Sequence, residues 1–139
     1  MDLIDTFSVA ASGLSAQRVR LQAVATNMAN ARTTRTEEGG PYRRRMPVFE
    51  AKVDPFANEL DRHLARVEVR EIVESDDPPT LVYDPAHPDA DAAGYVAYPN
   101  VNVLEEMVDL MLTARTYEAN TSVVQTTRNL ASSAIDLGR

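Results

Sequence analysis

The distribution of proline constrains the fold of this 139-residue chain more than any other feature. All eight prolines lie between Pro41 and Pro99, and both ends of the chain are free of them. Because proline removes a backbone hydrogen bond and clashes with the preceding turn of a helix, only the two ends can form long uninterrupted helices. We therefore expect a mainly α fold with three regions: an N-terminal helix within 1–31, a small β-rich middle module at 32–101 and a C-terminal helix within 102–139.

The N-terminal region repeats apolar residues in alternating steps of three and four, which predicts a helix over about 3–30. One seam, interrupted by a single polar residue, consists of Ile4, Phe7, Ala11, Leu14, Arg18, Leu21, Ala25 and Met28. A second seam on another face consists of Val9, Ala16, Val19 and Ala23. Two apolar faces indicate several neighbours, whereas an intramolecular two-helix hairpin uses only one seam per helix. Gly13 lowers helix stability by roughly 0.5–1 kcal/mol relative to alanine, which indicates that another backbone approaches closely there.

The C-terminal region begins with Asn102 and Glu105, an asparagine variant of the capping box. The helix should start at about Val103 and run to Leu137, roughly 52 Å at 1.5 Å per residue, before Gly138 ends it. Its first seam consists of Val103, Met107, Leu110, Ala114, Tyr117, Thr121 and Val124. Its second seam consists of Leu112, Ala119, Val123, Leu130, Ala134 and Leu137. We expect the two long helices to pack as a coiled coil, with the short middle module inserted between them.

The middle region contains short runs rich in valine and aromatic residues, bounded by glycine, proline or aspartate. Such runs are typical of strands, and they predict four, at 46–53, 67–73, 80–84 and 94–98. Between the first two, Asp54 followed by Pro55 can begin one or two helical turns within 54–66.

Charge and composition exclude several classes of function. The formal net charge is -7 at pH 7, and residues 68–109 hold eleven acidic residues against Arg70 alone, which argues against nucleic-acid binding. No run approaches 18 apolar residues, so we expect no membrane insertion. The first residues lack the basic leader and apolar run of a secretory signal, so export would need another route. The absence of cysteine excludes disulfides and thiolate metal sites but leaves the compartment open.

The chain contains none of the sequence motifs of hydrolases, nucleotide-binding loops or zinc proteases, so we expect no catalytic residues and no cofactor. Asp84, His87, Asp89 and Asp91 lie close together and could hold a divalent ion. The segment lacks the glycine and glutamate positions of an EF-hand loop, however. A polar loop braced by prolines is the favoured interpretation, and no metal is expected.

Two groups of arginines allow more than one interpretation. Arg43, Arg44 and Arg45 follow Tyr42 and could contact phosphate. A solvated turn, or ion pairs with the acidic middle of a neighbouring copy, is the favoured alternative. Arg18 interrupts an apolar seam, and its side chain either extends to water or pairs across an interface. We favour pairing, with Glu118 of the other helix as the carboxylate.

The N-terminal region contains a pattern of small residues, leucines and asparagines: Ser12, Gly13, Leu14, Ala16, Leu21, Ala25, Asn27, Ala29 and Asn30, followed by Thr33 and Thr34. In this pattern the chain resembles the rod and hook family of flagellar axial proteins. The resemblance covers nearly the whole chain; 51–68 is the least familiar part, and Thr26 stands where the family often has asparagine. A narrower resemblance, to proximal rod subunits, rests on "GGPYRR" at 39–44, "VYDPAHPDADAAGYV" at 82–96 and "YPNVNVLEEMVDLMLTARTYEAN" at 98–120.

The resemblance implies a structural subunit of the bacterial flagellar proximal rod, exported by the flagellar type III apparatus without a cleaved signal. Such subunits polymerise helically, line the export channel with their terminal helices and transmit torque through the periplasm as part of the drive shaft. The implied partners are copies of itself, other rod proteins, the adapter FliE and the MS ring. The expected assembly interface comprises Gly13, Leu14, Ala16, Arg18, Leu21, Ala25, Asn27, Met28, Ala29, Asn30, Asn100, Asn102, Met107, Leu110, Tyr117, Glu118, Asn120 and Val124.

A soluble helical adaptor or export chaperone that does not polymerise is the alternative, because it would also have amphipathic helices. An adaptor should form a folded helical hairpin alone, whereas a rod subunit should have mobile termini until it assembles. An enzyme of unknown class ranks third.

Overall fold

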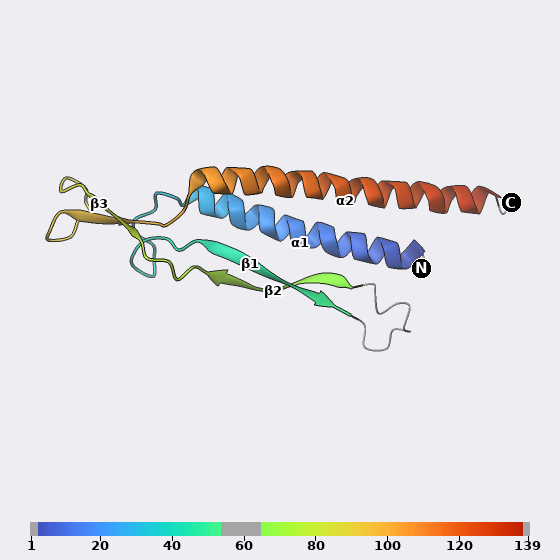
Figure 1. The fold of residues 1–139 in the computed structure, drawn as a ribbon, viewed down its shortest axis with the longest axis horizontal. Coiled ribbons are helices and arrows are strands. Elements are labelled where there is room, and N and C mark those ends of the chain that lie inside the picture. The colour runs from blue at the N-terminus through green and yellow to red at the C-terminus, as the bar shows by residue number, and fades with distance from the viewer. Residues whose placement is uncertain (1–2, 54–64, 138–139) are drawn as a thin grey trace.

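The computed structural model describes residues 3–53 and 65–137 and has the helix–strand–helix order that the proline distribution predicts (Figure 1). The predicted helical turns within 54–66 fall almost entirely outside these ranges, although Arg66 belongs to a strand. The elements in chain order are α1 (Leu3–Ala29), β1 (Arg45–Lys52), β2 (Arg66–Glu74), β3 (Thr80–Tyr83), β4 (Tyr95–Tyr98) and α2 (Val103–Leu137).

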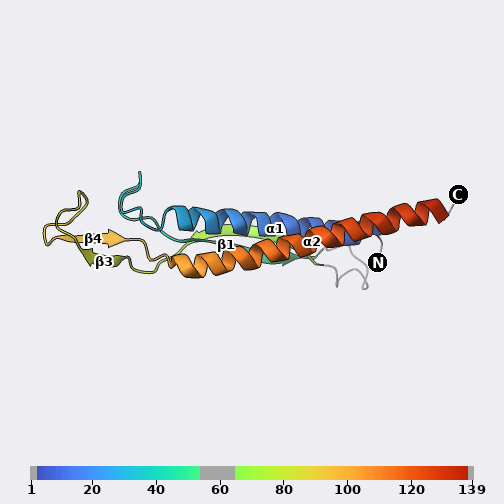
Figure 2. The same cartoon turned by 90° about the horizontal axis from the view of Figure 1, so that it is seen from above.

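The two helices lie side by side and run in opposite directions (Figures 1 and 2). The start of α2 at Val103 confirms the predicted cap: the Asn102 side-chain oxygen accepts a hydrogen bond from the Leu104 amide at 3.1 Å. The Asn102 side-chain amide donates to Glu105 at 3.0 Å, so Glu105 bonds the cap's side chain instead of its backbone. At its far end α2 extends past the N-terminal end of α1.

The middle region forms two separate antiparallel ribbons of two strands each. β1 pairs with β2 from Arg45 opposite Glu74 to Lys52 opposite Arg66, and both strands contact α1, so α1 lies between this ribbon and α2 (Figure 1). β3 pairs with β4, and this second ribbon projects beyond the other end of the helices. The expected β-rich middle is confirmed, but only its second ribbon stands clear of the helices.

The contact between the helices is built from small and polar residues. On α1 the buried residues include Ala16, Ala23 and Asn27, and on α2 they are Glu106, Thr113 and Thr127. Spacings of seven and fourteen residues place the three α2 residues on one face of the helix. An apolar pattern could not reveal this face, because its most buried positions are polar.

The predicted seams are therefore buried only in part. In the first α1 seam Ala11, Arg18 and Ala25 are exposed, whereas the second seam contributes the buried Ala16 and Ala23. The first α2 seam is partly buried, through Leu110, Ala114, Thr121 and Val124. The second α2 seam is exposed along its whole length: Leu112, Ala119, Val123, Leu130, Ala134 and Leu137.

Gly13 does lie at a close approach, as predicted, but the neighbour is a side chain. A Cβ atom added there would lie 3.1 Å from the side-chain nitrogen of Asn120 on α2. Within one chain, the expectation that another backbone approaches Gly13 was therefore wrong. The side-chain amide of Asn120 occupies the space beside Gly13.

Candidate assembly interface

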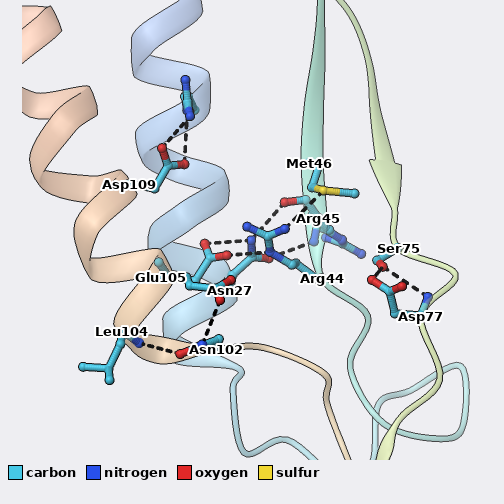
Figure 3. A network of polar contacts seen from close by, with 12 residues as sticks. Asn27, Arg44, Arg45, Met46, Ser75, Asp77, Asn102, Leu104, Glu105 and Asp109 are labelled. Atoms are coloured by element: carbon cyan, nitrogen blue, oxygen red, sulfur yellow. Dashed lines mark hydrogen bonds and ion pairs between the residues drawn. The ribbon is translucent and has the colours of Figure 1, made fainter.

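A buried polar cluster joins the two helices to the first ribbon where α1 ends and α2 begins (Figure 3). We call it the polar junction; it consists of Asn27, Tyr42, Arg44, Arg45 and Glu106. Asn27 and Glu106 are each only 1% exposed, which makes them two of the most buried side chains among the described residues. The junction therefore decides how the three parts of the chain are held together.

Asn27 uses all of its hydrogen-bonding capacity in the junction. Its side-chain nitrogen donates to Glu106 at 3.1 Å and to the Arg45 carbonyl at 2.9 Å. Its side-chain oxygen accepts from the Tyr42 hydroxyl and from the Arg45 amide, both at 2.8 Å. One asparagine thus bonds α2, β1 and the segment before β1, which leaves neither donor nor acceptor unpaired.

Glu106 brings a carboxylate into the interior, and Arg44 supplies the compensating charge. The Arg44 Nε donates to one carboxylate oxygen at 2.6 Å, while Asn27 bonds the other. The side chain of Arg44 is still 31% exposed, so its guanidinium stays partly hydrated. A buried carboxylate is tolerated only when it is paired in this way.

Tyr42 completes the junction as a neutral hydrogen-bond donor. Burial raises the pKa of Tyr42 above its ordinary value of 10.0; the charge of Arg45 lowers it, and Glu74 and Glu106 raise it. Because the raised pKa belongs to the folded state, the stabilisation is complete below pH 10.0 and is lost as pH rises through the folded-state pKa.

The three consecutive arginines find their carboxylates within the same chain. Arg43 lies 3.7 Å from Asp76, and Arg45 lies 3.1 Å from Glu74. With Arg44 bound to Glu106, each arginine has an intramolecular partner. The side chains of Arg43 and Arg45 nevertheless remain 62% and 47% exposed, in keeping with the expected solvated segment, and pairing with a neighbouring copy stays a prediction.

The helices are joined by a different ion pair from the predicted one. Arg20 binds Asp109 through two hydrogen bonds of 3.1 and 2.5 Å. Arg18 and Glu118 are both exposed, and among residues 3–53 and 65–137 no ion pair links them. The predicted pairing of Arg18 with Glu118 therefore does not occur within one chain; between copies it stays a prediction.

The other predicted interface residues divide by exposure. Ala16 and Asn27 are buried inside the chain, Asn102 caps α2, and the Asn30 side-chain amide donates to the Thr26 carbonyl at the end of α1. Half-buried residues are Gly13, Leu14, Leu21, Met28, Leu110, Asn120 and Val124. Exposed residues, in addition to Arg18 and Glu118, are Ala25, Ala29, Asn100, Met107 and Tyr117.

Sequence reasoning missed Glu106, Tyr42 and Arg44 as a structural unit. Glu106 belongs to the acidic region of residues 68–109, but it also stands seven residues before Thr113 in a series without apolar residues. A polar series at helical spacing, next to apolar ones, is the signal that could have identified it.

Three of the four side chains of the candidate metal loop bond the loop's own backbone, whereas the Asp89 carboxylate accepts a hydrogen bond from the Thr34 hydroxyl at 2.8 Å and pairs with Arg35. Asp84 accepts from the Ala86 amide, His87 accepts from the Asp89 amide, and Asp91 accepts from the amides of Ala93 and Tyr95. Within the described ranges, no three acidic or histidine side chains gather as metal ligands would. The same part of the chain contains no helix long and apolar enough to cross a membrane.

Two protein families match the helical ends of the chain. The family model described as "Flagella basal body rod protein" matches residues 7–35, and the one described as "Flagellar basal body rod FlgEFG protein C-terminal" matches residues 92–137. These matches cover most of α1 and all of α2 and define the class as rod proteins of the flagellar basal body.

Curated relatives extend the likeness over the whole chain. The chain is 42% identical to the flagellar basal-body rod protein FlgC of Borreliella burgdorferi over 97% of each chain. It is 40% identical to the FlgC proteins of Bacillus subtilis and Escherichia coli O157:H7 over the full length of each. The chain belongs to the FlgC family of flagellar basal-body rod proteins. These relatives are named as rod components, and none of the names is that of an enzyme.

Removing the buried carboxylate should destabilise the fold. We expect Glu106→Ala to lower the free energy of unfolding by about 3 kcal/mol. This value is at the lower end of the cost of breaking a buried ion pair, because the guanidinium of Arg44 stays partly hydrated. The control, Glu118→Ala, removes an exposed carboxylate from the same helix and should change it by less than about 0.5 kcal/mol. Urea unfolding followed by circular dichroism measures both, and equal effects would contradict the role of the junction.

Alkaline pH should weaken the junction through Tyr42. The free energy of unfolding should fall as pH rises above 10.0, because the unfolded tyrosine ionises before the folded one. Tyr42→Phe cannot ionise and should show a shallower fall over the same range. Urea titrations at a series of pH values compare the two proteins, and parallel curves would show that Tyr42 does not contribute.

Proposed function

We propose that this chain is a structural subunit of the proximal rod that polymerises helically through its terminal helices. In the assembled rod these helices line the export channel and form part of the drive shaft. The observation that carries the proposal is the likeness over nearly the full length to FlgC proteins, whose names describe them as rod proteins of the basal body. The exposed faces of the helices support it independently.

α2 has more apolar surface than one chain can cover. Leu104 is 73% exposed, Leu130 59% and Leu137 89%, and these residues span nearly all of the helix. Single exposed apolar residues are ordinary on soluble proteins, but a run of them along a 35-residue helix is typical of a surface that binds other chains. Neighbouring subunits on several sides would cover it.

We assign the assembly core to residues 1–31 and 102–139, where the helices would pack with those of other subunits as a coiled coil. Residues 32–101 would then form the middle domain, with the second ribbon away from the axis. The polar junction supports this division, because it gives every subunit the same angle between its helices and its first ribbon. A repeating assembly needs such identical subunits.

The family also suggests the setting. The basal body is the location that FlgC membership implies, and we propose that the subunit lies in the periplasmic rod after export without a cleaved signal peptide. Its partners would be copies of itself, other rod proteins, the FliE adapter, the MS ring and the export apparatus. We propose no nucleic-acid partner, no catalytic role and no direct membrane insertion.

One observation favours a second candidate, a soluble helical adaptor or export chaperone. α1 and α2 form an antiparallel hairpin held by the Arg20–Asp109 ion pair, which such an adaptor would also have. The two candidates differ in what happens to the exposed face of α2. An adaptor would leave this face uncovered and would not remain in purified basal bodies. A rod subunit would cover this face with neighbouring subunits and would be retained in purified basal bodies.

A charge on the exposed face of α2 should therefore block assembly without unfolding the subunit. Leu112 is 58% exposed, so Leu112→Glu should change the free energy of unfolding by less than about 0.5 kcal/mol. We expect this variant to be absent from purified basal bodies and its cells not to swim. The control, Leu81→Glu, places the same charge on the 64% exposed Leu81 of β3 and should retain more assembly. Normal swimming with Leu112→Glu would contradict an assembly role for this face.

A further inference from the structure

The second ribbon has few attachments to the rest of the chain. In the described part of the chain, β3 and β4 pair with each other and contact no other helix or strand. The ribbon projects beyond the helices, and only the short segments 75–79 and 99–102 connect it to β2 and α2 (Figures 1 and 2). Its orientation therefore depends on the side-chain bonds that link it to other parts of the molecule.

One carboxylate, that of Asp89 in the loop between β3 and β4, provides these bonds. One of its oxygens accepts a hydrogen bond from the Thr34 hydroxyl at 2.8 Å, and the other lies 3.7 Å from the guanidinium of Arg35. Thr34 and Arg35 both belong to the segment that follows α1. Among residues 3–53 and 65–137, no other hydrogen bond or ion pair joins residues 80–98 to the rest of the chain. Asp89 therefore ties the second ribbon to the end of α1.

His87 fixes the backbone from which this carboxylate extends. Its Nδ1 accepts a hydrogen bond from the Asp89 amide at 3.1 Å. The imidazole ring packs edge-on against the phenol ring of Tyr98 on β4, with the ring centroids 6.2 Å apart. An imidazole nitrogen can accept a hydrogen bond only while it carries no proton. The bond therefore requires a neutral His87 with its proton on Nε2, because an imidazolium would turn an N–H group toward the N–H group of Asp89.

The surroundings of His87 contain a second set of partners for its charged form. Asp84, Asp89 and Asp91 lie in the same loop, and Arg35 reaches this loop through Asp89. An imidazolium would be attracted to these carboxylates and would compete with Arg35 for Asp89. The loop therefore has two arrangements: in one His87 accepts from the backbone, and in the other it pairs with the carboxylates.

We propose that His87 and Asp89 form a pH-dependent latch that holds the second ribbon against the segment after α1. Histidine is the side chain whose charge ordinarily changes between pH 5 and pH 8. At the upper end of this range the Asp89 amide is bound, and its carboxylate binds Thr34 and Arg35. At the lower end the amide loses its acceptor, the carboxylate leaves Thr34, and the ribbon changes its orientation. The latch acts within one chain, so it goes beyond the proposed function and does not depend on polymerisation.

Spin labels on two introduced cysteines measure the latch in the isolated full-length chain, which contains no natural cysteine. Glu50→Cys on β1 and Leu81→Cys on β3 place one label on each ribbon, both at exposed positions. We expect a narrow distribution of distances between the labels at pH 8 and loss of this narrow peak at pH 5. Adding Asp89→Ala should remove the narrow peak at both pH values. The same distribution at both pH values without Asp89→Ala, or a narrow peak that survives it, would overturn the proposal.

His87→Asn separates titration from packing. The asparagine oxygen can accept from the amide two residues further on, as the side chain of Asp84 does from Ala86 in the same loop, but asparagine does not titrate. This variant should keep the narrow peak at both pH values. Loss of the peak only at pH 5 would assign the response to the carboxylates, and loss at both values would assign it to packing against Tyr98. Either result would overturn the latch. His63→Gln, at the other histidine of the chain, should respond to pH as the natural chain does, and loss of the response in this variant would contradict the assignment to His87.

Discussion

The fold depends on a single buried carboxylate, that of Glu106, at the start of α2. Its two oxygens bind Arg44 from the segment before β1 and Asn27 from the end of α1, so three segments distant in sequence meet at one group. A carboxylate in that position cannot remain unpaired, because the cost of removing it from water is high. Any arrangement that separates the helices from the first ribbon would leave the Glu106 carboxylate without its partners.

The rest of the contact between the helices follows from the same constraint. Small residues such as Ala16 and Ala23 let the helices approach, and the buried threonines of α2 satisfy their hydroxyls on their own helix: Thr113 donates to the Asp109 carbonyl and Thr127 to the Val123 carbonyl. Burial of such residues contributes little hydrophobic free energy. The polar junction and the Arg20–Asp109 pair therefore determine the alignment of the helices to an unusual degree.

Elements with local causes could be predicted from the sequence, whereas contacts between distant residues could not. The cap at Asn102 and the prolines of the middle region place α2 and the four strands within a few residues. The faces of the helices were assigned less well, because apolar periodicity identifies any apolar face and does not say what covers it. Asn27 and Glu106 are 79 residues apart, so their bond depends on the completed fold.

The arrangement reverses the usual division of a helical hairpin, in which apolar residues lie inside and polar residues outside. Here polar and small residues hold the chain together, while leucines and methionines of α2 face outward. A hairpin aligned by hydrogen bonds keeps one geometry before it meets a neighbour, because a shift would break bonds that water cannot replace. Its large apolar side chains then remain available for contacts between copies. Of the predicted seams, the second one of α2 is exposed along its whole length, whereas the other three are partly buried within the chain. The exposed seam is the surface that a subunit would need if it is to complete its hydrophobic contacts by assembly.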